Sequence, residues 1–151
     1  MLRYLWSESL FVLSAAIQYR YKPERMSLIT IEEAEEILDE IANSLPAAFY
    51  KYLNAGIILR PETKIHPEAR ADDLFILGEY RRDCLGRYIV IFYGSFIRVY
   101  GGLDRRKAAV KLREILLHEF THHLEALAGV RDLEIKDALD MARYCLKGNS
   151  S

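Results

Sequence analysis

Three of the chain's four histidines lie in one six-residue stretch, His118-Glu119-Phe120-Thr121-His122-His123. Residues 118 and 122 are four positions apart, so on a helix both imidazoles share one face and can each place a nitrogen about 2.0–2.1 Å from a single Zn²⁺. Glu119 projects about 100° further round the helix, close enough to hold a metal-bound water without being a ligand. In this His-Glu-x-x-His arrangement the metal lowers the pKa of the water and polarises a carbonyl, while the glutamate carries the proton. The stretch therefore predicts hydrolysis at zinc with Glu119 as general base.

The region around this motif resembles the small bacterial zincin-like metallopeptidases, a minimal metalloprotease domain. The resemblance covers about residues 74–133, through segments 76–80, 86–90 and 93–94, and above all through residues 116–123. It implies a zinc-dependent peptidase core of a few strands and helices. It also implies that His118 and His122 are the zinc ligands, that Glu119 is the general base, and that the substrate is a peptide or protein.

The third metal ligand is where the chain departs from the family pattern. The family has Gly three residues after the second His and a ligand Asp three residues later, but Glu125 and Ala128 occupy these positions here. A Gly-x-x-Asp follows four residues later and ends at Asp132, about 6 Å further along the helix. Two more extended residues, about 3.3 Å each, span that gap and lead to Glu134. The interpretation favours Glu134 over Asp132, which also suits the N-cap of the last helix.

Two further carboxylates are interpreted as supporting the ligands rather than binding the metal. Glu125 shares the helix face of His118 and His122, but it lies about 10.5 Å from His118 along the axis, too far to join one small ion. It is therefore assigned as a partner of His122, and Asp137 is given a similar role.

The remaining polar candidates receive weaker roles. His123 points away from the 118/122 face and is interpreted as structural, and His66 lies in a loop and receives no role. Three strand tyrosines could donate a phenol to an oxyanion, although strand tyrosines usually serve packing: Tyr88, Tyr93 and Tyr100. Because Gly94-Ser95 lacks a Gly-x-Ser-x-Gly elbow, a serine hydrolase is not indicated.

The motif lies in a long helix predicted over residues 105–128, capped by Asp104 and stopped by Gly129. Apolar residues cover most of its circumference, which indicates a central helix: Val110, Ile115, Leu116, Leu117, Phe120, Leu124 and Leu127. A last helix is predicted over residues 133–147, with an inner face made by Leu133, Leu139, Ala142 and Cys145.

The segment before this helix has a strongly β-type composition. Strands are predicted at 74–80 and 87–93, joined by a turn at 81–86, with a third strand at 96–100 after a bulge or bend at Gly94-Ser95. Another strand is predicted at 57–59, and residues 61–73 read as a surface loop.

A helix is predicted to begin at Thr30, where Thr30-Ile31-Glu32-Glu33 has the form of a capping box, and to end before Pro46. A short helix at 46–53 follows, closed by Gly56 in a left-handed conformation. Together these elements predict an α+β fold, zincin-like, with a small, mostly antiparallel sheet packed on the long metal-binding helix.

Length and composition predict one domain. The chain has 151 residues, and residues 26–147 are assigned to a single metallopeptidase domain. Residues 1–25 are interpreted as an extension, poorly ordered or upstream of a true start at Met26, with a secretory signal around residues 10–17 as the minor alternative. Residues 148–151 are expected to form a flexible tail.

Charge and cysteine content limit the partners. With 21 basic and 22 acidic residues and a pI of about 6.4, no nucleic-acid partner is expected. No apolar run is long enough to predict a membrane span. Cys84 and Cys145 are interpreted as reduced core cysteines, which fits a cytoplasmic location.

Two functions remain open at this point. The first is a zinc metallopeptidase that holds an extended substrate on an edge strand of its sheet. The alternative is a catalytically silent binding or regulatory module stabilised by the metal. Because a module needs only the ligands, the general base Glu119 favours the enzyme.

Overall fold

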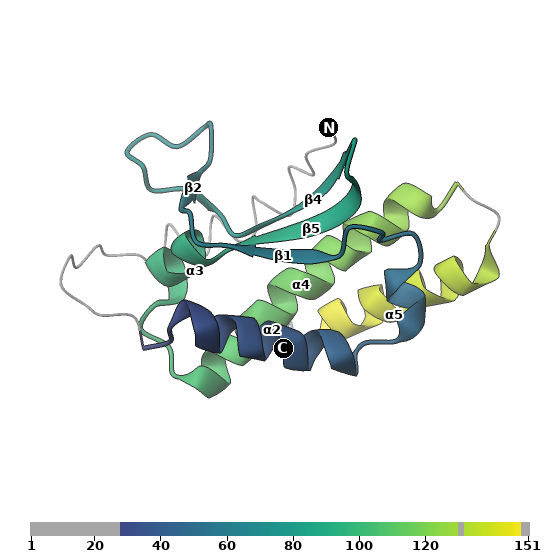
Figure 1. Cartoon of the computed structure of the whole chain (residues 1–151), viewed down its shortest axis with the longest axis horizontal. Coiled ribbons are helices and arrows are strands. Elements are labelled where there is room, and N and C mark those ends of the chain that lie inside the picture. The colour runs from purple at the N-terminus through teal and green to yellow at the C-terminus, as the bar shows by residue number, and fades with distance from the viewer. Residues whose placement is uncertain (1–27, 130–131, 149–151) are drawn as a thin grey trace.

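The computed structural model describes residues 28–129 and 132–148, which form a mixed α/β fold (Figure 1). The helices are α2 (Ile31–Ser44), the 3₁₀ helix η1 (Ala47–Tyr50), α3 (Tyr93–Tyr100), α4 (Arg105–Leu127) and α5 (Leu133–Gly148). The strands are β1 (Ile57–Arg60), β2 (Lys64–Ile65), β3 (Phe75–Ile76), β4 (Gly78–Asp83) and β5 (Gly86–Phe92). Helices combined with a small sheet agree with the predicted α+β class.

The main sheet has three strands in the order β1-β5-β4. β4 and β5 form the predicted antiparallel hairpin, whereas β1 runs parallel to β5. The expectation of a mostly antiparallel sheet therefore holds for only one of its two strand pairs. β2 and β3 form a separate two-stranded antiparallel sheet.

Helix α4 is the centre of the molecule, as its apolar sequence predicts. It lies between the sheet and the two helices α2 and α5 (Figure 1), and it contacts β4, β5, α2 and α5. The Asp104 side chain caps it by accepting a hydrogen bond from the Lys107 N–H at 2.9 Å. From residue 115 to residue 124 every side chain of α4 is buried, so groups in this stretch are held by the core.

Helix α2, the first in the described part of the chain, also begins as predicted. Thr30 and Glu33 form a capping box, in which each side chain accepts a hydrogen bond from the backbone N–H of the other. The buried face of α2 follows the helical period: Ala34, Ile37, Leu38 and Ile41. Gly56 takes the expected left-handed conformation, with φ of 72°.

The predicted strand at 96–100 is wrong, because these residues belong to α3. Their aromatic and β-branched composition favours a strand, but Phe96 and Tyr100 are both buried and lie four positions apart, which is the helical period. Gly94 allows the helix to pack against the loop between β1 and β2, since a Cβ there would lie 2.5 Å from Oγ1 of Thr63.

Other details differ from the sequence-based expectations. The β4–β5 turn is limited to two residues, 84–85, because Gly86 adopts φ of 113°. Three residues expected inside are exposed: Cys84, Val110 and Leu133. The first lies in that turn, and the other two face away from the core on their helices.

None of the helices formed by the described residues is long and apolar enough to cross a membrane. The predictions for residues 1–25 lie outside the described residues. Gly148 belongs to α5, and the rest of the predicted tail also lies outside them.

Candidate functional site

Helix α4 brings His118 and His122 together, as their spacing predicts. Their Nε2 atoms lie 3.0 Å apart, and their rings meet edge to face with centroids 4.7 Å apart. Both residues are buried, with 4% and 0% of their surface exposed. The helix therefore presents two imidazole nitrogens that converge on one point.

The protonation of this pair suits metal binding. Burial lowers the pKa of His118 to about 3, helped by the charge of His122. Burial also lowers the pKa of His122 to about 4. Both imidazoles are therefore neutral at pH 7, the form that binds metals. Two Zn–N bonds of about 2.05 Å at a tetrahedral angle would place the nitrogens about 3.3 Å apart, close to the observed separation.

Glu125 lies where the sequence places it, beside His122. Its Oε2 is 3.5 Å from Nδ1 of His122, and its Oε1 accepts a hydrogen bond from Arg143 of α5 at 3.2 Å. A metal on Nε2 of His122 would require the ring hydrogen on Nδ1, and this hydrogen would point toward Glu125. The arrangement suits a carboxylate that orients the imidazole rather than a ligand.

Glu119 lies at the contact between α4 and β4. A Cβ added to Gly78 of β4 would lie 3.1 Å from Cγ and 3.3 Å from Oε1 of Glu119. The same atom would lie 3.1 Å from Cγ2 of Ile115, so the helix packs directly on the strand backbone. Because Gly78 has no side chain, the carboxyl group of Glu119 can lie directly beside β4.

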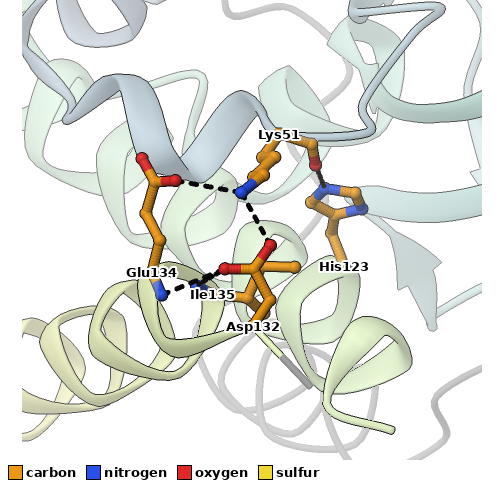
Figure 2. A network of polar contacts seen from close by, with 5 residues as sticks. All are labelled: Lys51, His123, Asp132, Glu134 and Ile135. Carbon is orange, nitrogen blue, oxygen red and sulfur yellow. Dashed lines mark hydrogen bonds and ion pairs between the residues drawn. The ribbon is translucent and has the colours of Figure 1, made fainter. Parts of the chain in front are cut away.

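The two candidates for a third ligand are both paired with Lys51. Lys51 Nζ lies 2.6 Å from Oδ2 of Asp132 and 3.0 Å from Oε2 of Glu134, so it bridges both carboxylates (Figure 2). Asp132 also accepts hydrogen bonds from the backbone N–H groups of Glu134 and Ile135, as predicted for an N-cap. Within residues 28–129 and 132–148, no three His, Cys, Asp or Glu side chains are grouped to hold a metal ion.

His123 connects this Lys51 cluster to the sheet. Its Nε2 lies 2.8 Å from the Lys51 carbonyl oxygen, and its Nδ1 lies 3.2 Å from the Tyr80 hydroxyl. Since a carbonyl only accepts, Nε2 carries the hydrogen and Nδ1 accepts from Tyr80. On α4, His123 projects about 100° from His122. The backbone of Lys51 therefore contacts α4 through His123, a different residue from the histidine pair.

The other candidates lie apart from the pair. The Tyr88 hydroxyl donates to Asp83 at 2.5 Å, and the Tyr93 hydroxyl donates to the Ile29 carbonyl at 2.8 Å. Tyr100 packs on Phe96 with ring centroids 5.5 Å apart. Asp137 is exposed on α5. His66 lies in the loop before β3, where its Nδ1 accepts from the Glu68 N–H at 3.1 Å.

Sequence reasoning missed Gly78, Tyr80 and Lys51. Lys51 and Glu134 are separated by 83 positions, and Tyr80 and His123 by 43. No local pattern marks such contacts. A signal was available only for Gly78, because a glycine inside a β-type run often marks a close backbone approach.

Replacing Lys51 by Met is expected to lower the thermal unfolding midpoint, because it leaves Asp132 and Glu134 close together without their shared cation. The hydrogen bond from Lys51 lowers the pKa of Asp132, so this stabilisation is present at neutral pH and is lost as the pH falls below about 3.9. Calorimetry at pH 7, where this stabilisation is present, measures the difference. Lys136→Met, an exposed position on α5, is the control. Equal midpoints for the two variants at pH 7 would contradict the prediction.

Comparison with known proteins finds a similar solved structure. A solved structure described as a conserved hypothetical protein from Thermus thermophilus is 35% identical, and the match covers 68% of this chain and 100% of that chain, with a TM-score of 0.57. No protein-family model matches the chain, and no curated protein does.

Proposed function

The chain belongs to the same family as the conserved hypothetical protein from Thermus thermophilus, and within that family we propose that it acts as a zinc-dependent metallopeptidase of the zincin-like kind. One observation carries the proposal. Two neutral, buried imidazole nitrogens converge at 3.0 Å on α4, next in sequence to a carboxylate placed at the edge strand of the sheet.

His118 and His122 would hold the ion through Nε2, and Glu125 would orient the ring of His122 through Nδ1. Zinc, when bound, lowers the pKa of a water and polarises a carbonyl. Glu119 accepts the proton on its carboxylate and returns it to the leaving amine. Asp132 or Glu134 would complete the ligand set by exchanging Lys51 for the metal, and otherwise water fills the remaining positions.

Strand β4 would hold the substrate. It lies at the edge of the three-stranded sheet, and its first residue, Gly78, contacts Glu119. An extended peptide that pairs with such an edge gains main-chain hydrogen bonds regardless of its side chains. A peptide bound to this edge would then pass directly beside Glu119, the proposed general base.

Metal analysis of protein purified without added zinc tests the proposal. We expect one Zn²⁺ per chain in the wild type, and loss of the metal from the double variant His118→Ala, His122→Ala. His66→Ala is the control, since His66 lies in a distant loop. A double variant with full metal content would rule out this site. Metal contents of Asp132→Ala and Glu134→Ala then identify the third ligand.

A metal-stabilised binding module is the second candidate. The ion pairs of Lys51 favour it, because both Asp132 and Glu134 are already occupied by this lysine. A site with two imidazoles and no third protein ligand would bind zinc less tightly. Such a module would bind metal and peptide without turnover.

A further inference from the structure

The backbone of β4 offers its hydrogen-bonding groups to the sheet edge at defined positions. Phe92 donates its N–H to the Leu77 carbonyl at 2.9 Å, which fixes the phase of the antiparallel ladder. Because hydrogen-bonded and non-hydrogen-bonded pairs alternate, the next pair, Gly78 opposite Ile91, is non-hydrogen-bonded. Gly78 therefore turns its N–H and C=O away from β5, at the place where β4 meets Glu119.

Two arginines face each other further along the same strands. Arg82 lies opposite Arg87, and the alternation makes this a non-hydrogen-bonded pair, in which opposed side chains are closest. Since residues two apart share a face, Arg82 lies on the same face of β4 as Gly78. Like charges directly opposite one another are destabilising. The pair is therefore unfavourable unless an anion joins it.

The described residues do not supply that anion. Within residues 28–129 and 132–148, neither Arg82 nor Arg87 has an ion pair, and the buried Nε of Arg87 has no hydrogen-bond partner. The cationic side chains nearby, by contrast, are paired with carboxylates. Lys51 is engaged by two carboxylates, and Arg81, on the opposite face of β4, is bound by Glu79.

We infer that Arg82 and Arg87 form a subsite for an acidic side chain of the peptide that β4 holds. The inference rests on the proposed function and names its substrate class. Four strand residues separate Arg82 from Gly78, about 13–14 Å, so the recognised Asp or Glu lies about four residues from the cleaved bond. Two guanidinium groups can bind one carboxylate by charge-assisted, forked hydrogen bonds.

A nonapeptide library with Glu, Gln or Lys fixed at one position at a time tests the subsite. With zinc-loaded wild type we expect Glu to raise kcat/KM about tenfold over Gln, through KM, at a position about four residues from the cleaved bond. The double variant Arg82→Gln, Arg87→Gln should lose this preference, and added salt should weaken it in the wild type. Circular dichroism confirms that the variant is folded.

Arg60→Gln is the matched control, because Arg60 is exposed on β1, at the other edge of the sheet. It removes one arginine charge by the same Arg-to-Gln change and should keep the preference. Equal cleavage of Glu and Gln peptides at every position, or a preference that survives the double substitution, overturns the subsite.

Binding separates this inference from the proposed function. The same peptides, labelled with fluorescein, are titrated against full-length Glu119→Gln protein and followed by anisotropy. If the wild type cleaves nothing but binding prefers Glu and needs both arginines, the peptidase proposal fails and the subsite stands. Binding without any preference for Glu, or no binding of any peptide, overturns the subsite.

Discussion

Substitution of Glu119 by Gln is expected to slow peptide hydrolysis by about 10²- to 10⁴-fold, the usual contribution of a positioned general base. The amide keeps the size and shape of the side chain, so its contact with Gly78 is retained. It cannot accept a proton, so the step that activates water is lost. Cleavage of a peptide library and the zinc content should be measured on the same preparation, since zinc should remain bound.

Glu35→Gln is the control for this substitution, because Glu35 is an exposed residue of α2 and should leave hydrolysis unchanged. Zinc-dependent cleavage by Glu119→Gln at the wild-type rate would contradict the role of Glu119 as general base. A zinc-loaded wild type that cleaves no peptide would support the binding module instead.

Acid is expected to unfold the metal-free protein well above the pH at which carboxylates protonate. His118 and His122 have folded pKa values of about 3 and about 4, below the unfolded value of about 6.5. The unfolded chain therefore binds more protons below pH 6.5, and stability falls with pH. For two histidines the loss between pH 6.5 and 4.5 approaches about 5 kcal/mol, comparable with the whole stability of a small domain.

Urea titrations in the presence of a chelator, at pH values from 7 to 4.5, measure this loss. Burial also lowers the pKa of His123, which adds in the same direction. The double variant His118→Gln, His122→Gln should show a shallower decline, because the two side chains no longer titrate. A free energy of unfolding that stays level between pH 6.5 and 5 would contradict the prediction.

The fold was predictable where the governing interactions are local. The Thr30 capping box, the Asp104 cap and the β4–β5 hairpin each depend on residues a few positions apart, and all are present. Helix α3 was missed because residue composition was given more weight than the spacing of Phe96 and Tyr100. The parallel pairing of β1 was not predictable, since it depends on residues far along the chain.

The candidate site was also predictable only where its contacts are local in the sequence. Helical spacing places His118 and His122 together and Glu125 beside them. The third ligand was inferred from a distance along the chain, and such a distance does not show which side chains pair with Asp132 and Glu134. In the fold both carboxylates pair with Lys51, which directly follows η1.

The parallel pairing of β1 with β5 also has a kinetic consequence. The β4–β5 hairpin closes a two-residue turn, whereas Ile57 must find Ile89 across the whole intervening chain. Closing the longer loop costs more conformational entropy, and this cost is incurred before the contacts between β1 and β5 can form. The hairpin can therefore form first, with β1 docking onto it later. Because η1 and Lys51 lie a few residues before β1, we expect the ion pairs that join Lys51 to Asp132 and Glu134 to form with the docking of β1, after the hairpin.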